Sequence, residues 1–109
     1  MNLPDQIKRQ SIQKIAKLAK SILEEKVNLI EASREINRLK SYIKNPDDTI
    51  FDTFLLTVSD TDHIPIGEKV RKNYSVYYLR KIDKDLEEYL ADMKSGIIKA
   101  CKELIKKYS

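Results

Sequence analysis

Apolar side chains recur every three or four residues along most of this chain, and this spacing constrains its fold more than any other feature. Such a period places the apolar residues on one stripe of an α-helix. Helix breakers are rare, with two glycines and three prolines in 109 residues. Charged residues make up 35% of the chain and hydrophobic residues 41%, a balance that suits exposed helix faces around one modest core. We therefore predict an all-α fold, a compact bundle of four to five helices in a single domain over residues 1–109.

Two helices are expected in the first part of the chain. Apolar residues follow helical spacing over residues 12–23 and again over residues 29–43. One continuous helix through both stripes and the residues around them would be about 60 Å long, more than the rest of the chain can cover. We place a break at residues 25–28, because Asn28 followed by Glu31 has the form of a capping box.

A third, short helix is expected after Asn45-Pro46, because proline disfavours helical geometry in the residue before it. Asp47 or Asp48 is a suitable cap for this helix, which carries apolar residues at helical spacing from Ile50 to Val58. Within it Phe54, Leu56 and Val58 also alternate, so a strand is an alternative.

Two further helices are expected in the second half. The pattern predicts a short helix over Tyr74–Lys81, and then a long helix that Asp83 caps. The long helix has the clearest apolar stripe of the chain, from Leu86 to Tyr108.

The charge pattern changes between Asn45 and Glu68, where the chain holds six acidic residues and no lysine or arginine. Both flanking segments are basic, and the net charge is +4. The middle of this region carries the only histidine, a proline and a glycine, and it has no helical period. We therefore expect one long acidic loop at about residues 59–73.

A carboxylate-rich surface complements a basic groove built for phosphates. We therefore predict a non-enzymatic protein-binding module that neutralises a basic partner, such as a toxin or nuclease domain. An apolar anchor would supply desolvated area beside the charges. The predicted partner-binding residues are Asp47, Asp48, Asp60, Asp62, His63, Ile64, Ile66 and Glu68.

A structural role for the two central aspartates is the alternative. Asp60 and Asp62 have the side chains that form Asx turns with loop N–H groups. We expect one of them to cap the following turn and the other to be exposed.

The segment Lys69–Tyr78 offers a second functional interpretation. Three cations precede three tyrosines there, a mixture that can neutralise and stack single-stranded nucleic acid. The tyrosines can equally pack the loop onto the helices, and we favour this packing. A nucleic-acid-associated regulator is thus the alternative function. The residues are Lys69, Arg71, Lys72, Tyr74, Tyr77 and Tyr78.

Metal binding and catalysis are not expected. Asp60, Asp62 and His63 are ligand types, but a calcium loop begun at Asp60 would need glycine where Pro65 stands and glutamate where Arg71 stands. No serine or cysteine lies in a recognisable nucleophile motif. No cofactor is predicted.

No membrane span, secretion signal or internal disulfide is expected. The longest uncharged runs have seven residues, whereas a spanning helix needs about 20 apolar residues. The amino-terminal residues lack the basic-then-apolar order of a signal peptide. The single cysteine, Cys101, lies on an apolar stripe and is expected in the core. We expect a cytoplasmic protein, and a homodimer is left open.

Three stretches carry a resemblance to a known family: residues 29–36, residues 51–54, and residues 59–68 with the following Val70 and Arg71. In these the chain is similar to a family of small uncharacterised bacterial helical proteins, over about residues 20 to 105. Some members of that family look like immunity or accessory proteins encoded beside toxins. The resemblance implies such a role here and carries over no site residues.

Overall fold

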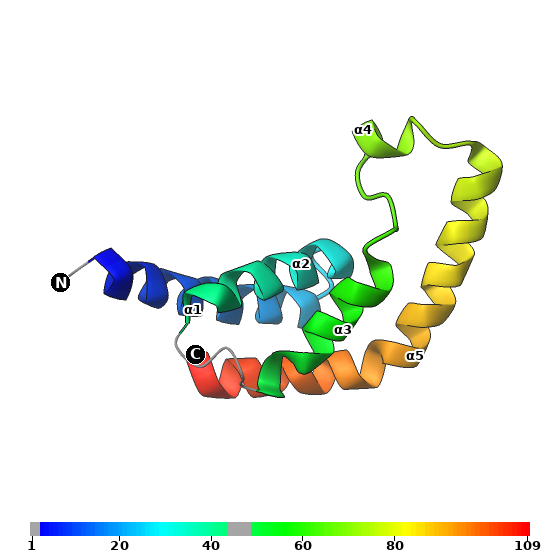
Figure 1. Ribbon diagram of the computed structural model, residues 1–109. Helices are drawn as coiled ribbons and strands as arrows, with labels where there is room; N and C mark the ends of the chain where they lie inside the picture. The colour runs from blue at the N-terminus through cyan, green and yellow to red at the C-terminus, as the bar shows by residue number, and fades with distance from the viewer. Residues whose placement is uncertain (1–2, 44–48) are drawn as a thin grey trace.

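A computed structural model describes residues 3–43 and 49–109, and these residues form helices and no strand. The predicted all-α fold is confirmed, and the strand alternative for residues 54–58 is wrong (Figure 1). The elements in chain order are α1 Leu3–Leu23, α2 Leu29–Leu39, the 3₁₀ turns η1 Lys40–Tyr42 and η2 Thr49–Phe51, α3 Asp52–Thr61, α4 Glu68–Arg71 and α5 Val76–Tyr108.

The break between α1 and α2 lies where the sequence predicts it. Glu25 leaves the helix with a positive φ of 57°, and α2 begins after Asn28. The Asn28 side-chain oxygen accepts a hydrogen bond of 3.0 Å from the Glu31 N–H. This bond satisfies one of the free N–H groups at the start of a helix, so the chain folds back instead of extending.

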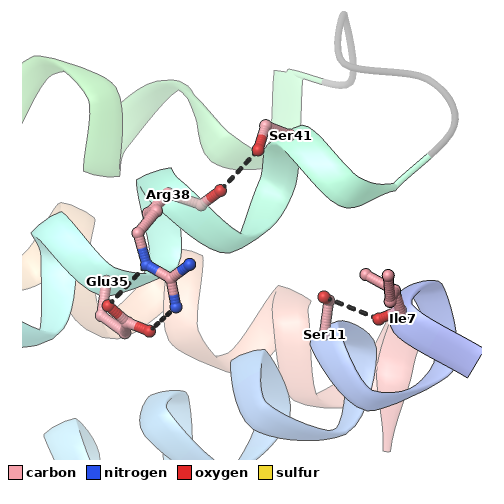
Figure 2. A network of polar contacts seen from close by, with 5 residues as sticks. All are labelled: Ile7, Ser11, Glu35, Arg38 and Ser41. Carbon is pink, nitrogen blue, oxygen red and sulfur yellow. Dashed lines mark hydrogen bonds and ion pairs between the residues drawn. The ribbon is translucent and has the colours of Figure 1, made fainter.

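Short polar contacts satisfy side chains in α1, α2 and η1 (Figure 2). The buried Ser11 hydroxyl donates to the Ile7 carbonyl at 2.8 Å, which allows a serine on the inward stripe of α1. The Ser41 hydroxyl donates to the Arg38 carbonyl at 2.8 Å, and the Arg38 guanidinium pairs with Glu35. The first bond removes the cost of burying a polar group; the pair with Glu35 is exposed and contributes little.

The core lies between α1, α2, α3 and the carboxyl-terminal half of α5. α1 runs beside α5, and α2 lies beside α3 (Figure 1). The predicted inward stripes of α1, α2 and α5 meet in this core. Its buried residues are Ile15, Ala19, Ile36, Leu39, Ile43, Phe51, Phe54, Ile97, Ala100, Cys101 and Leu104.

α5 is one continuous helix, so the predicted division at Asp83 is wrong. The helix begins after Ser75, whose hydroxyl accepts a 3.1 Å hydrogen bond from the Tyr78 N–H. Asp83 lies inside α5, where its carboxylate accepts two hydrogen bonds from Arg71, at 3.0 and 2.7 Å. No proline or glycine separates residues 76 and 95, and nothing else in this stretch requires a break.

The predicted loop at residues 59–73 is shorter than expected. α3 continues through Thr61, and α4 occupies Glu68–Arg71. Two arginines hold the segment between α3 and α4. Arg34 on α2 donates to the Thr61 carbonyl at 2.9 Å and to the Ile64 carbonyl at 3.3 Å, which places a cation at the carboxyl end of α3. Arg71 donates to the Pro65 carbonyl at 3.5 Å.

The molecule is more elongated than a compact bundle of this length. Its extents are 52 × 28 × 24 Å and its radius of gyration is 15.2 Å, against about 13 Å for a compact domain of this size. The amino-terminal half of α5 causes this, because it extends away from α1 toward the end of the molecule where α4 lies (Figure 1). The start of α5 and the neighbouring α4 therefore project from the bundle, which does not cover their surface.

Candidate functional site: an acidic face on α3 and α5

A hydrogen bond between Tyr89 and Asp60 joins the end of α3 to α5. The Tyr89 hydroxyl donates to the Asp60 carboxylate at 2.8 Å. Burial of the ring disfavours the phenolate, and the bond to Asp60 favours the protonated form, so together they raise the pKa of Tyr89 to about 12. Tyr89 is therefore a neutral donor at physiological pH, and it fixes Asp60 against the middle of α5.

Asp85, Glu88 and Asp92 flank Tyr89 on α5. Asp85 and Asp92 lie four and three residues from Tyr89, and Glu88 lies three residues from Asp85 and four from Asp92, so the three carboxylates share one side of the helix. All three are exposed. Together with Asp60 of α3 and Asp62, which directly follows that helix, they form what we call the acidic face: Asp60, Asp62, Asp85, Glu88 and Asp92.

Sequence reasoning missed the α5 half of this face. The sequence contains a signal for it, because residues 85–93 hold four acidic residues and no lysine or arginine. The net positive charge of the surrounding segment masks this local acidic run. That these carboxylates lie beside Asp60 follows only from the packing of α3 on α5.

Asp62 and His63 are both exposed, with 76% and 60% of their side chains accessible. The His63 Nδ1 lies 3.9 Å from an Asp62 carboxylate oxygen, an arrangement that forms an ion pair only when the imidazole is protonated. Asp62 is thus the exposed aspartate that we expected. The expectation that the other aspartate caps the turn is wrong, because Asp60 bonds to Tyr89 instead.

Ile64 is not the exposed anchor that we predicted. Its side chain is 7% exposed and packs with Ile30 and Ile82 in a second, smaller core cluster. Ile66 packs against the same cluster and is half-buried. On the other side of this residue, Arg34 donates a hydrogen bond to the Ile64 carbonyl.

Glu68 is exposed in the first turn of α4, after Gly67 with a φ of 91°. Only glycine adopts this angle readily, so Gly67 fixes the chain direction that exposes Glu68. Asp47 and Asp48 lie outside the described residues. Their predicted roles, as a helix cap and as partner contacts, stay predictions.

An exposed leucine lies next to the acidic face. Leu56 is 49% exposed and lies one turn before Asp60 on the same side of α3. It offers the apolar contact that the sequence assigned to Ile64.

The tyrosines after α4 lie at the projecting end of the molecule, in what we call the tyrosine tip: Tyr74, Tyr77 and Tyr78. Tyr77 is 85% exposed, and Tyr74 stacks on Tyr78 with ring centroids 5.3 Å apart. The stacking packs Tyr74, which precedes α5, onto Tyr78 of that helix, as the favoured prediction has it. The prediction is wrong for Tyr77, which is exposed. Isoleucines and arginines also hold the loop.

The three cations before the tyrosine tip differ in whether they pair with a carboxylate. Lys69 and Lys72 are exposed. Arg71, by contrast, pairs with Asp83, and the hydrogen bond to that carboxylate raises its pKa. Two of the three predicted cations are thus available to a ligand.

Cys101 is fully buried in the core, as predicted. Burial raises the pKa of its thiol to about 11, so thiolate is scarce at neutral pH and the residue is a poor nucleophile. Within residues 3–43 and 49–109 we find no group of three His, Cys, Asp or Glu side chains able to hold a metal ion. Over the same residues, no helix combines the length and apolarity needed to cross a membrane.

Comparison of this chain with protein-family models, with curated proteins and with solved structures found no match.

Proposed function

We propose that this protein is a non-enzymatic binding module that uses the acidic face to bind a basic protein. The observation that carries the proposal is the Tyr89–Asp60 hydrogen bond, because it joins two acidic segments that are far apart in the sequence into one surface. Five exposed carboxylates in such a surface attract a partner rich in lysine and arginine and speed the encounter.

Leu56 supports the proposal as the apolar contact. Interfaces draw most of their affinity from a few desolvated side chains, while rim charges mainly set specificity and association rate. Leu56 lies beside Asp60 and is half exposed, so a partner that covers the carboxylates also buries it. A nuclease-like toxin fits this description, since its groove for phosphates is basic; neutralisation in the cytoplasm would then follow from blocking that groove.

The experiment is a titration of the purified protein against a basic nuclease domain encoded beside its gene, at low and high salt. The test variant is Asp62→Asn with Glu88→Gln, which removes two charges from the acidic face and keeps side-chain size. The matched control is Glu24→Gln with Glu103→Gln, which removes the same charge from exposed positions elsewhere. We expect the test variant to bind about tenfold more weakly at low salt, through slower association. Equal weakening by the control would refute the acidic face as the binding surface.

A second candidate function is favoured by the exposure of the tyrosine tip. Base stacking needs open aromatic faces next to cations. Tyr77 is 85% exposed, and the exposed Lys69 and Lys72 precede it in the chain. This supports an association with single-stranded nucleic acid. Titration with generic single-stranded RNA and DNA at two salt concentrations tests it: binding should fall steeply with salt and should weaken in Tyr77→Ala. Absence of binding at low salt would remove this candidate.

A further inference from the structure

A groove with apolar walls runs between the end of α1, the turn after it and the middle of α5. Its volume is about 720 Å³. It lies on the side of α5 away from Tyr89, because its residues fall about half a helical turn from that side chain. The groove is lined by Ile22, Leu23, Glu25, Val27, Leu29, Glu87, Leu90, Ala91, Lys94, Ile97, Ile98 and Lys102.

The groove leaves apolar side chains incompletely covered. Val27 is 40% exposed, and Leu90 and Ile98 are only partly buried. Leu90 belongs to the predicted inward stripe of α5, yet nothing in the described chain closes over it. A contiguous apolar hollow rimmed by charges is typical of an interaction surface.

The charges of the groove have opposite signs at its two ends along α5. Glu87 lies at one end and Lys102 at the other, about 22 Å apart at 1.5 Å per residue. Neither has an ion-pair or hydrogen-bond partner among the described residues. The two are too far apart to pair within one chain.

We propose that the groove is occupied by α5 of a second copy of this chain, packed antiparallel about a twofold axis beside Ser95. A twofold interface uses the same patch on both copies, so the patch must complement itself. An axis midway between Glu87 and Lys102 brings each of these residues opposite the other in the second copy, twice per dimer. The same axis places Ile98 of each copy at Ala91 of the other, where the small side chain leaves room.

The surroundings of the axis are compatible with this close approach. Ala91 and Ser95 are small and exposed, and Lys94 has Glu25 lining the same groove to balance its charge. A parallel arrangement in register would instead place Glu87 against Glu87 and Lys102 against Lys102, which is unfavourable. The contact is limited to the middle of α5 and the turn before α2, so the dimer belongs with the smaller, weaker interfaces.

Charge reversal with mixing tests both the dimer and its direction. By analytical ultracentrifugation over a concentration series, the wild type should dimerise. Glu87→Lys and Lys102→Glu, each alone, should raise the dimer dissociation constant at least about tenfold, because both pairs become repulsive. An equimolar mixture of the two variants should recover dimers, since only the mixed pair restores both attractions. Both positions are exposed, and circular dichroism checks that the variants stay folded.

Cross-linking provides a measurement that does not depend on the strength of the dimer. A short thiol cross-linker should join two copies of Ser95→Cys, which lie beside the axis. It should not join Lys84→Cys, whose two copies are about 32 Å apart along the helices. The buried Cys101 does not compete for the reagent. A wild type that stays monomeric at the highest concentration reached, a mixture that fails to recover dimers, or equal cross-linking at both positions would overturn the proposal.

Discussion

Replacing Ile64 with alanine separates a core role from a binding role for the acidic region. Ile64 is 7% exposed and packs against Ile30 and Ile82. The substitution removes about three buried carbon atoms, which at about 0.8 kcal/mol each gives about 2.5 kcal/mol of lost transfer free energy. The cavity left behind adds to this, so we expect the free energy of unfolding to fall by about 2.5–4 kcal/mol.

The loss should appear in global unfolding, because α2 and α5 each contribute to both core clusters. Urea denaturation followed by circular dichroism measures it. Ile36→Ala, in the main core, is the positive control and should cost about 2–5 kcal/mol. Lys99→Ala, on the exposed side of α5, is the negative control and should cost under about 0.5 kcal/mol.

If Ile64→Ala unfolds at the same urea concentration as Lys99→Ala, the Ile64 side chain does not pack in the second cluster. If partner binding is also lost in that variant, Ile64 is an exposed anchor after all.

Three further results are expected. Tyr89 should be the last tyrosine to ionise in a spectroscopic pH titration, because its pKa is raised to about 12. The stability that it contributes is therefore present below about pH 10 and is lost as the pH rises through 12. A final ionisation step that persists in Tyr89→Phe would contradict this. Cys101 should react with a thiol reagent only when the chain unfolds, because the thiol is buried and its pKa is raised to about 11; rapid labelling of the native protein would show an open core. Ser33→Ala should stabilise the protein by about 1 kcal/mol in thermal or urea unfolding, since the Ser33 hydroxyl is buried without a hydrogen-bond partner among the described residues; a loss of stability would indicate a partner such as a bound water.

Periodicity predicted the helical fold because apolar spacing along a helix is a local property. The break before α2 was predictable for the same reason, since Asn28 and the Glu31 N–H it binds are three residues apart. The continuity of α5 was not. Aspartate is a common cap, and only the distant Arg71 shows that Asp83 serves as an ion-pair partner inside a helix.

The candidate site was predictable only in its charges. Exposure of Asp62 and Glu68 follows from the cost of burying a carboxylate. Burial of Ile64 depends on its packing against Ile30 and Ile82, which are distant in the sequence and leave no pattern around residue 64. The union of Asp60 with the carboxylates around Tyr89 likewise depends on how α3 meets α5, a tertiary contact that a single sequence does not reveal.

The pairing of α1 with α5 has a consequence for synthesis of the chain. The inward stripe of α1 gains much of its cover from residues 97–104 of α5, so it stays uncovered until that part of α5 has been made. At about 5–20 residues per second, the ribosome takes several seconds or more to reach it. Through that interval the nascent chain exposes Ile15 and Ala19 to chaperones and proteases, and assembly of the bundle has to wait for residues made near the end of this sequence.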